Sequence, residues 1–441
     1  MTVRWNLLTE AIKMAKFTEK LRKMAFGTVD ALKGGHIQKH VDEIATSIAK
    51  GSPERAEKLQ KILQHAVNTV PIYKGISPES IENFRVMDKN FIRENSASFL
   101  SSAFEEHQRI AAVTSGSTGT PFKVFHDRNK KSRNSADTIY FASRAGFSVG
   151  EKLYYFKIWS ALNHKSFSLR YMQNITPVDV IHLDDNQIEK LIKEIENDGS
   201  DMGFLGYSSA LELVARYLDK TYHGPVKAKV NSIISMSEGL NEYTKNTLTK
   251  FFGTQAVSRY SNIENGIIAQ QETDGLLRFR INTASYHIEI LGMDSDIPVK
   301  KGKLGRIVVT DFYNYAMPMI RYDTGDIGCL STEDDNYLQT IEGRKLDLIY
   351  DTKGDLISSY IVYKNMWQYV EINQYQFVQY GPKDYLFKVN SDSAFGKEEK
   401  LVAEFKQYLG KDANFKVEYV DEIPLLSSGK RKKIMNTYHN K

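Results

Sequence analysis

Cysteine is almost absent from this sequence. The 441 residues include one cysteine, Cys329, which excludes an internal disulfide and any zinc site built from several cysteines. Cys329 lies in the apolar stretch 327–330, so we expect a small buried hydrophobic residue there and no nucleophile. A chain with so little cysteine suits a reducing compartment, and we predict a cytoplasmic location.

Long apolar runs and concentrated charge are missing as well. No run reaches the ~20 apolar residues that a membrane-spanning helix needs, and the first residues, MTVRWNLLTEAIK, lack the apolar core of a secretory signal. A net charge of +5 is too small to indicate a nucleic-acid-binding surface, although it suits a small anionic substrate. With no set of cysteines to bind it, a metal ion would be held by oxygen ligands and phosphate groups.

What the sequence does contain is the length and composition of a globular protein. A chain of 441 residues predicts two to three domains, and 41% hydrophobic with 26% charged residues is ordinary for a folded protein. Apolar residues recur at helical spacing over residues 59–70, and Pro71 ends the pattern. We therefore expect a helical N-terminal region over residues 1–95.

Short β-rich segments alternate with helical segments between residues 110 and 340. This alternation predicts βαβ units around a mainly parallel sheet. Residues 276–312 have longer alternating patterns, which predict an antiparallel β-subdomain, and residues 385–420 predict a small separate lobe. The predicted fold class is α/β: a large N-terminal α/β domain with parallel sheets and a β-subdomain over residues 1–342, plus a small mobile C-terminal α+β lobe over residues 343–441.

Residues 10–26 combine basic and apolar side chains at the spacing of an amphipathic helix. Two interpretations follow. The helix either packs its apolar stripe on the body of the protein and leaves the charges in solvent, or it contacts a membrane surface. We favour packing on the body, because most amphipathic helices of globular proteins pack in this way.

The segment 111–127, AAVTSGSTGTPFKVFHD, concentrates glycine and hydroxyl residues between two β-like flanks. An ordered loop of this composition presents backbone N–H groups and hydroxyl donors, which together can bind phosphate oxygens. It is not a P-loop, because no Gly-Lys-Ser/Thr follows. The alternative interpretation is a simple turn. The loop residues are Thr114, Ser115, Gly116, Ser117, Thr118, Gly119 and Thr120.

Four more motifs follow in order: SRYSNIENG at 258–266, RYDTGDIG at 321–328, EGRKLD at 342–347 and IPLLSSGKRKK at 423–433. With the loop, they resemble the adenylate-forming superfamily of acyl-CoA synthetases, luciferases and peptide-synthetase adenylation domains. The sequence is most similar to the phenylacetate:CoA ligase branch and its capsule-biosynthesis relatives, and LQKILQHAVNTVPIY and VMDKNFIREN resemble the N-terminal region of that branch. The resemblance covers essentially the whole chain.

The resemblance implies an ATP-dependent, AMP-forming ligase. Such an enzyme joins a carboxylic acid to AMP, releases pyrophosphate, and passes the acyl group to coenzyme A. It also implies roles for the matching residues. The loop would bind the β and γ phosphates, Tyr260 with Ser261 would contact adenine, and Glu264 would bind Mg²⁺. Asp326, expected in a turn, would accept hydrogen bonds from the ribose hydroxyls.

Two more residues match functional positions of the family. Arg344 matches the arginine that closes the nucleotide site near the hinge, and Lys430 matches the lysine that neutralises charge at the α-phosphate. The resemblance further implies that the C-terminal lobe rotates between the two steps, presenting first Lys430 and then the hairpin around residues 351–354. By position along the chain alone, Tyr140, Ser235, Ser237 and Glu238 are candidates for the acid pocket.

Several alternatives stay open at this stage. The acceptor could be an amine or a hydroxyl instead of coenzyme A, for example in polysaccharide or metabolite biosynthesis. Ser261 and Ile263 stand where the family usually has glycine and threonine, so a nucleotide-binding homologue without catalysis is a third hypothesis. Neither the acid nor the oligomeric state can be predicted from these motifs.

Overall fold

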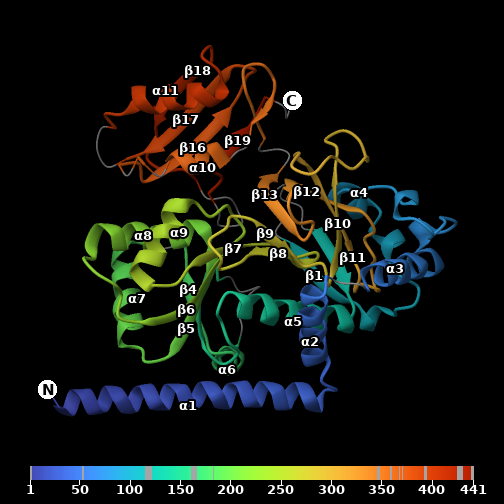
Figure 1. Ribbon diagram of the computed structural model, residues 1–441, viewed down its shortest axis with the longest axis horizontal. Coiled ribbons are helices and arrows are strands. Elements are labelled where there is room, and N and C mark those ends of the chain that lie inside the picture. The colour runs from blue at the N-terminus through green and yellow to red at the C-terminus, as the bar shows by residue number, and fades with distance from the viewer. Residues whose placement is uncertain are drawn as a thin grey trace.

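The computed structural model describes residues 2–51, 54–114, 122–159, 166–181, 183–344, 348–357, 360–366, 368–369, 371–391, 395–424 and 431–438. These residues form a large N-terminal part and a smaller C-terminal lobe, which lies on one side of it (Figure 1). Helix α1 runs along the opposite side of the large part. The α/β class predicted from the sequence is confirmed.

The N-terminal region is helical, as predicted. It contains α1 (Thr2–Leu32), α2 (His36–Ala49), α3 (Arg55–Thr69), η1 (Pro71–Tyr73), η2 (Ile81–Asn83), α4 (Lys89–Glu94), η3 (Ser96–Phe99) and η4 (Glu106–Gln108). Helix α3 buries Ile62, Leu63 and Ala66, because residues three and four apart lie on one face of a helix. Val70 ends this helix in an extended conformation directly before Pro71, as the steric effect of proline on the preceding residue requires.

One half of the large sheet is parallel and is covered by helices. Its strands are β3 (Lys152–Lys157), β4 (Ile175–Asp179), β5 (Asp201–Tyr207), β6 (Lys229–Met236) and β7 (Ala256–Asn262), and the helices are α5 (Arg128–Arg144), α6 (Phe167–Met172), α7 (Asp185–Asn197), α8 (Ser208–Thr221) and α9 (Glu242–Phe252). Apolar residues of α7, α8 and α9 pack on β3, β5 and β6 in one core. This half is the βαβ region that the sequence predicts.

The other half of the large sheet is antiparallel. It contains β8 (Gly266–Gln271), β9 (Phe279–Ile281), β10 (Tyr286–Leu291), β11 (Gly305–Asp311), β12 (Tyr322–Leu330) and β13 (Tyr337–Arg344). The β-subdomain predicted for this region is not a separate sheet. Strand β8 pairs with β7, so both halves join in one sheet of order β10-β11-β12-β13-β9-β8-β7-β6-β5-β3-β4 among the described residues. Cys329 is buried in β12, as predicted.

The C-terminal lobe has its own sheet and core. Its elements are β14 (Ile349–Tyr350), β15 (Leu356–Ile357), α10 (Tyr360–Met366), β16 (Gln374–Gln379), β17 (Asp384–Asn390), α11 (Glu398–Leu409), β18 (Asn414–Tyr419) and β19 (Ile434–Asn436). The strand order is β18-β17-β16-β19, and Phe377, Phe387 and Phe405 form the centre of the core. The boundary predicted at residue 343 lies inside β13, which continues through Arg344 in the large sheet.

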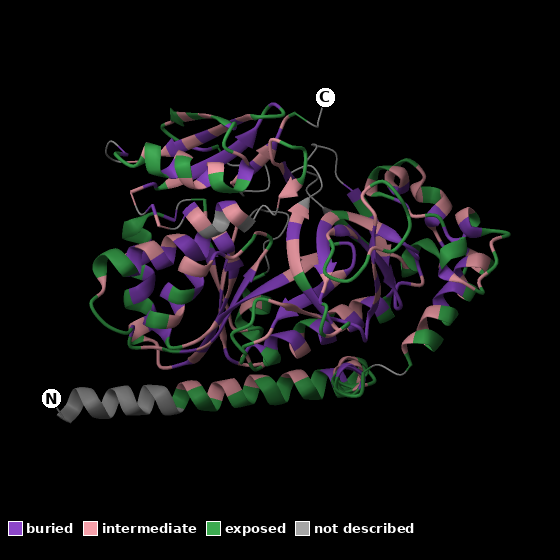
Figure 2. Cartoon of the chain, turned by 45° about the horizontal axis from the view of Figure 1, so that its top comes forward, coloured by how far each residue is buried: buried purple, intermediate pink, exposed green. Residues whose placement is uncertain are grey.

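Helix α1 differs from the sequence-based expectation. The apolar residues Met14, Phe17, Leu21 and Met24 are 66%, 59%, 46% and 67% exposed, so the predicted packing of this stripe on the body is wrong. The reason is that α1 contacts the body through another side, where Glu19 accepts a hydrogen bond from the backbone N–H of Asp201 at 2.9 Å. Figure 2 shows the exposed side of α1 in green. None of the described helices is both long and apolar enough to cross a membrane.

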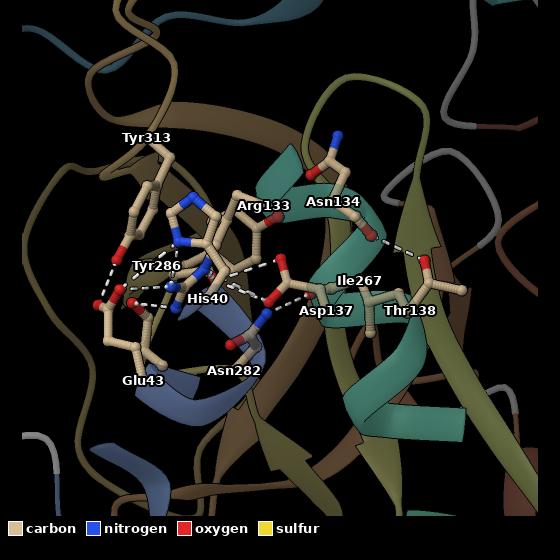
Figure 3. Close-up of polar contacts among 12 residues, drawn as sticks. His40, Glu43, Arg133, Asn134, Asp137, Thr138, Ile267, Asn282, Tyr286 and Tyr313 are labelled. Atoms are coloured by element: carbon tan, nitrogen blue, oxygen red, sulfur yellow. Dashed lines mark hydrogen bonds and ion pairs between the residues drawn. The ribbon is translucent and has the colours of Figure 1, made fainter. Parts of the chain in front are cut away.

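A buried charge network joins α2 and α5 to the sheet (Figure 3). Arg133 on α5 donates to Ser285 Oγ at 2.8 Å and to the carbonyl of Ala284 at 3.0 Å. Its guanidinium also lies 3.1 Å from Glu43 on α2 and 4.1 Å from the ring centroid of Tyr313. The network therefore ties three distant parts of the chain together through a single cation.

Asp137, one turn after Arg133, is a second buried member of this network. Both side chains are fully buried, and Nε of Arg133 lies 3.7 Å from Oδ1 of Asp137. Burial raises the pKa of the Asp137 carboxyl, against the opposing effect of Arg133. Ser285 donates from Oγ to Asp137 Oδ1 at 2.9 Å. The serine hydroxyl thus accepts from the arginine and donates to the aspartate.

Candidate active site

Tyr260 and Asp326 lie next to each other, although 66 positions separate them in the sequence. Tyr260 is near the end of β7 and Asp326 is in β12. The Tyr260 hydroxyl donates to Asp326 Oδ2 at 2.7 Å and lies 3.3 Å from Thr324 Oγ1. Burial and the nearby Asp326 carboxylate raise the pKa of Tyr260 well above its usual value, so the phenol keeps its proton and remains the donor.

The turn predicted for Asp326 is wrong. Asp326 lies inside β12, where its Cα is paired with that of Arg344 on β13. The Thr-Gly-Asp sequence suggests a turn because Gly325 has a positive φ of 77°, but here the glycine sits next to an irregular register between β11 and β12. The strand bends at that point and continues, which directs Asp326 toward Tyr260.

Glu264 is a buried carboxylate directly after β7, and it is 4% exposed. Its Oε1 lies 3.0 Å from Lys89 Nζ and accepts a hydrogen bond from the Tyr322 hydroxyl at 3.3 Å. Both partners come from elements remote in sequence, since Lys89 begins α4 and Tyr322 begins β12. A buried carboxylate is thus paired with one cation and one phenol.

The backbone of Glu264 is fixed as well. His126 Nε2 lies 2.8 Å from the Glu264 carbonyl oxygen. Burial, with a contribution from Lys130, lowers the pKa of His126 to about 4, so the imidazole is neutral at pH 7. Because the carbonyl can only accept, Nε2 carries the proton and donates.

The phosphate loop predicted at 114–120 is placed only through its two ends. Strand β1 (Ile110–Thr114) pairs antiparallel with β2 (Phe122–His126), and Thr114 is opposite Phe122. This confirms the hairpin predicted from the flanks. Residues 115–121, including Ser115, Gly116, Ser117, Thr118, Gly119 and Thr120, lie outside the described residues.

Lys89 connects the start of β2 to Glu264. Its Nζ lies 5.0 Å from the ring centroid of Phe122, the first described residue after the loop, and 3.0 Å from Glu264. Two motifs that the sequence predicts to bind phosphate and metal therefore meet at one lysine. Sequence reasoning missed Lys89, Tyr322 and His126. One sequence signal was available for the local structure at Lys89. Asp88, the residue before it, caps α4 by accepting from the Phe91 N–H at 2.8 Å, so Lys89 could be placed at the start of a helix.

The donor set near Glu264 fits magnesium only if phosphate groups complete the coordination. The described residues contain no cluster of three or more His, Cys, Asp or Glu side chains able to hold a metal ion. Magnesium is often bound by one or two carboxylates together with substrate phosphates. Glu264 can supply one carboxylate, through Oε2, because both contacts given above use Oε1.

Three of the four candidates for the acid pocket come together. Ser235, at the end of β6, contacts the Ser208 hydroxyl, and Ser208 also donates to the Glu238 carbonyl at 2.8 Å. Glu238 Oε2 accepts from the Ser209 N–H at 2.9 Å, at the start of α8. Ser237 has a positive φ of 73°, an uncommon conformation for a residue other than glycine.

The fourth candidate, Tyr140, lies elsewhere. It is on α5 and borders a small cavity with Ile48, Arg144 and Arg280, and its ring packs edge-on against Phe141. By contrast, Glu238 Oε1 is buried and has no hydrogen-bond partner within the described part of the chain. Such an acceptor is costly to leave unpaired, which makes the Ser235–Glu238 segment the stronger candidate for a binding pocket.

The last two predicted residues are described only in part. The backbone of Arg344 pairs with Asp326 in the large sheet, and nothing is described of its side chain. Lys430 lies outside the described residues. The hairpin predicted around residues 351–354 is formed by β14 and β15, and its Thr352 N–H donates to the Leu409 carbonyl at 2.8 Å. The hairpin is therefore attached to the end of α11.

A largely buried ion pair joins the C-terminal lobe to the large part. Lys433, just before β19, contacts the carboxylate of Glu212 on α8. Glu212 also accepts from Arg216 at 3.1 Å and from Asn241 at 3.2 Å. The Lys433 ammonium lies 5.1 Å from the ring centroid of Tyr375. We call this contact between Lys433 and Glu212 the lobe latch.

Replacing Lys433 by methionine is expected to weaken the contact between the lobe and α8. The variant removes the cation from a desolvated pair, and such a change costs about 3 kcal/mol or more of free energy when the remaining charge is unpaired. Because Arg216 and Asn241 still contact Glu212, we expect the contact between the two parts to lose about 2 kcal/mol. Small-angle scattering should show a larger radius of gyration. Lys383→Met, which removes an exposed pair with Asp412 inside the lobe, is the control and should leave the radius unchanged.

The lobe latch should also depend on pH. Lys433 and Arg216 lower the pKa of Glu212 to about 2 from its usual 4.5, against the opposing effect of burial. A lowered carboxyl pKa contributes stability above the usual pKa, and this stability is lost as the pH falls toward the lowered value. Scattering of the wild-type protein should therefore show lobe release between about pH 4.5 and 2. Release that occurs only on raising the pH above neutrality would contradict this assignment.

Comparison with known proteins gives consistent results. Residues 349–437 match the family described as the CapK C-terminal domain. The chain is 23% identical over 381 residues to Protein CapK from Staphylococcus aureus, with 82% of each chain covered. It is 23% identical over 285 residues to phenylacetate-coenzyme A ligase from Pseudomonas putida, with 62% of this chain and 64% of the relative covered.

The fold is also that of a solved acyl-CoA ligase. The structure of 2-hydroxyisobutyryl-CoA ligase in the postadenylation state, in complex with 2-HIB-AMP, has a TM-score of 0.69 at 15% identity and covers 89% of this chain and 91% of that chain. The same ligase in the thioesterification state, with the same shares covered, has a TM-score of 0.55 at 17% identity. The TM-score is therefore higher for the postadenylation state than for the thioesterification state, although the same fraction of each chain is compared.

Proposed function

We propose that this protein activates a carboxylic acid with ATP, because its sequence and fold are similar to those of adenylate-forming acyl-CoA ligases. A carboxylate oxygen of the acid attacks the α-phosphorus, the bond to pyrophosphate breaks, and an acyl-adenylate forms. The thiol of coenzyme A then attacks the acyl carbon, and AMP leaves. Both the activation of the acid and the use of coenzyme A as acceptor are part of this proposal.

The contact of Lys89 with both Glu264 and Phe122 carries the proposal. It places a positive charge between the end of the glycine-rich loop and a buried carboxylate, where phosphate groups of a nucleotide need cations and donors. Mg²⁺, if bound by Glu264, would neutralise charge on the phosphate oxygens. Lys430 would supply a further positive charge near the α-phosphate once the lobe has closed.

The pair of Tyr260 and Asp326 supports a nucleoside site. An aspartate can accept from both ribose hydroxyls, and the Tyr260 hydroxyl holds one of its oxygens at 2.7 Å. The Tyr260 ring would at the same time offer a flat apolar surface to adenine. Ser261 is partly buried beside it, whereas the Ile263 side chain is 51% exposed, so the unusual isoleucine need not obstruct the pair.

The arrangement of the lobe supports an adenylation-type conformation. The superposition on 2-hydroxyisobutyryl-CoA ligase has the higher TM-score for the postadenylation state. Within this proposal, the adenylation step uses the lobe orientation in which Lys430 would approach the α-phosphate. The hairpin of β14 and β15 would be delivered after rotation of the lobe, for the transfer step.

The unpaired carboxylate oxygen of Glu238 suggests the class of acid. A substrate with a hydroxyl or ammonium group could donate to Oε1, which has no partner among the described residues. Sites that hydrogen-bond a substrate group discriminate strongly against analogues that lack the group. We therefore propose hydroxy- or amino-substituted acids as the first compounds to test.

The proposed function is tested by acid-dependent exchange of labelled pyrophosphate into ATP. The panel should contain hydroxy, amino, sugar, aryl and aliphatic acids, with Lys430→Ala as a variant. Exchange with one class of acid that is lost in the variant would support adenylation. Thioester formation with coenzyme A, or amide or ester formation with another acceptor, then identifies the second step. ATP binding without exchange by any acid would favour the non-catalytic homologue.

Replacing Asp326 by alanine is expected to raise the KM for ATP about 10- to 100-fold, because it removes charge-assisted hydrogen bonds to the ribose. Tyr260→Phe keeps the ring and removes only the hydroxyl that holds Asp326, so we expect a smaller increase of about 2- to 10-fold. Asp335→Asn changes an exposed acid paired with Lys301 and serves as control. Steady-state kinetics with varied ATP and 2′-deoxy-ATP checks the assignment, since the Asp326 effect should shrink with the deoxy analogue.

A further inference from the structure

The outward face of α1 carries a row of unburied apolar residues. Met14, Phe17, Leu21 and Met24 are spaced by three or four positions, which places them on one side of the helix. Each is 46% to 67% exposed. A monomeric soluble protein rarely leaves such a continuous row uncovered unless a partner covers it.

A row of lysines runs beside this apolar row. Lys16, Lys20 and Lys23 each stand directly before one of the apolar residues, so they repeat at the same helical spacing on the adjacent side. All three are exposed, and none has an ion-pair partner among the described residues. Long lysine side chains can keep their ammonium groups in water or near phosphate groups while their carbon chains lie along an apolar surface.

Both acidic residues of the same stretch are engaged by other parts of the chain. Glu19 and Asp30 are the only acids among residues 14–32. Glu19 accepts from the N–H of Asp201 at 2.9 Å in the body, and Asp30 accepts from the N–H groups of Ile37 and Gln38 at 3.1 and 2.9 Å at the start of α2. The fully exposed charges of residues 14–32 are therefore lysines, beside the exposed apolar row.

Helix α6, which contacts α1, also exposes apolar side chains. Phe167, Tyr171 and Met172 are 76%, 66% and 64% exposed. Arg22 of α1 donates from Nε to the Tyr171 carbonyl at 3.3 Å, and its guanidinium lies 5.2 Å from the Tyr171 ring centroid. The two helices are thus in contact, and both lie on the side away from the C-terminal lobe (Figure 1).

We propose that α1 and α6 form a docking surface for a membrane that contains anionic lipids. An interfacial helix inserts an apolar face among the acyl chains while basic residues contact the headgroups, and the two rows of α1 have this arrangement. A second copy of the chain is a poorer partner. If two α1 helices packed antiparallel through their apolar rows, a twofold axis would bring both lysine rows to the same side of the interface, where they would repel.

The test is co-sedimentation of the full-length protein with vesicles. We expect binding to vesicles of phosphatidylcholine mixed with phosphatidylglycerol, and much weaker binding to phosphatidylcholine alone. Changing Lys16, Lys20 and Lys23 to glutamine should lower the partition coefficient on the order of 100-fold, because each basic residue near an anionic surface contributes about fivefold. Changing Phe17, Leu21 and Met24 to serine should lower it at least about 10-fold. Added salt should reduce wild-type binding.

A matched control is available on another exposed, basic and partly apolar segment. Lys300, Lys301 and Lys303 are exposed beside Ile297, which is 71% exposed, and changing these three lysines to glutamine should leave vesicle binding unaltered. Circular dichroism melting should show that all variants remain folded. The proposal is overturned by absence of vesicle binding, by equal binding to neutral vesicles, or by concentration-dependent dimerisation that the serine variant abolishes.

Discussion

The Arg133→Met variant is expected to lose about 3 to 5 kcal/mol of unfolding free energy in the large N-terminal part. Arg133 is fully buried and is the cation shared by Glu43 and Asp137. Methionine has a similar length but no charge, so the fully buried Asp137 would lose this partner in a desolvated setting, whereas the partly exposed Glu43 would keep its contact with Lys58. Removing one partner of a buried ionic network is costly for this reason, whereas an entire network can be replaced by apolar residues at little cost.

Urea unfolding followed by circular dichroism measures the effect. The matched control is Arg144→Met on the same helix, whose ion pair with Glu272 at 2.7 Å involves an arginine side chain that is 52% exposed. We expect a loss of no more than about 1 kcal/mol there. A double variant, Arg133→Met with Asp137→Asn, should recover part of the loss because the second change removes one unpaired charge. Equal losses in the two arginine variants would argue against a stabilising role of burial in this network.

The Glu264→Gln variant is expected to lower the rate of ATP–pyrophosphate exchange roughly 10²- to 10³-fold. Glutamine keeps the size and one carbonyl oxygen of the side chain but removes its charge, which weakens the pairing with Lys89 and would weaken the proposed binding of Mg²⁺. The loss should be accompanied by a need for higher Mg²⁺ concentrations. The protein should remain folded, since Tyr322 can still donate to the amide oxygen.

Glu333→Gln at an exposed position controls for a general effect of removing a carboxylate. The exchange assay should be run over a Mg²⁺ titration for both variants and for the wild type. If the Glu264 variant kept the wild-type rate and the wild-type Mg²⁺ dependence, Glu264 would have no role in metal binding. A lower rate with unchanged Mg²⁺ dependence would instead assign Glu264 to positioning Lys89.

Local patterns predicted the individual elements well. The apolar periodicity of α7 and α8 and the alternation in β17 and β18 are properties of short segments, so the sequence alone indicates them. The joining of the parallel and antiparallel parts could not be predicted in this way. The β7–β8 contact between them is local, but one continuous sheet also requires β9 to pair with β13, in which Phe279 faces Leu338, and no short-range pattern encodes such a distant register.

The same distinction explains the candidate site. Tyr260, Glu264 and Asp326 could be proposed from the sequence because each lies in a recognisable motif. Lys89 and Tyr322 were missed because only the fold brings them to Glu264. The prediction that the apolar row of α1 is covered was wrong for a related reason. The spacing of its apolar residues shows that they share a face, but it cannot show whether that face packs on the body. In the structure, Glu19 attaches the helix to the body through another side.

The lobe latch bears on how the two parts of such an enzyme can be exchanged between relatives. Lys433 is three residues from Lys430, and a chain of this length spans at most about 11 Å. If Lys430 has the role proposed above, the contact of Lys433 with Glu212 on α8 limits how far from α8 its backbone can act. We therefore expect a chimera that combines this lobe with the large domain of a relative to hold the lobe more firmly when that domain carries an acid at the position matching Glu212.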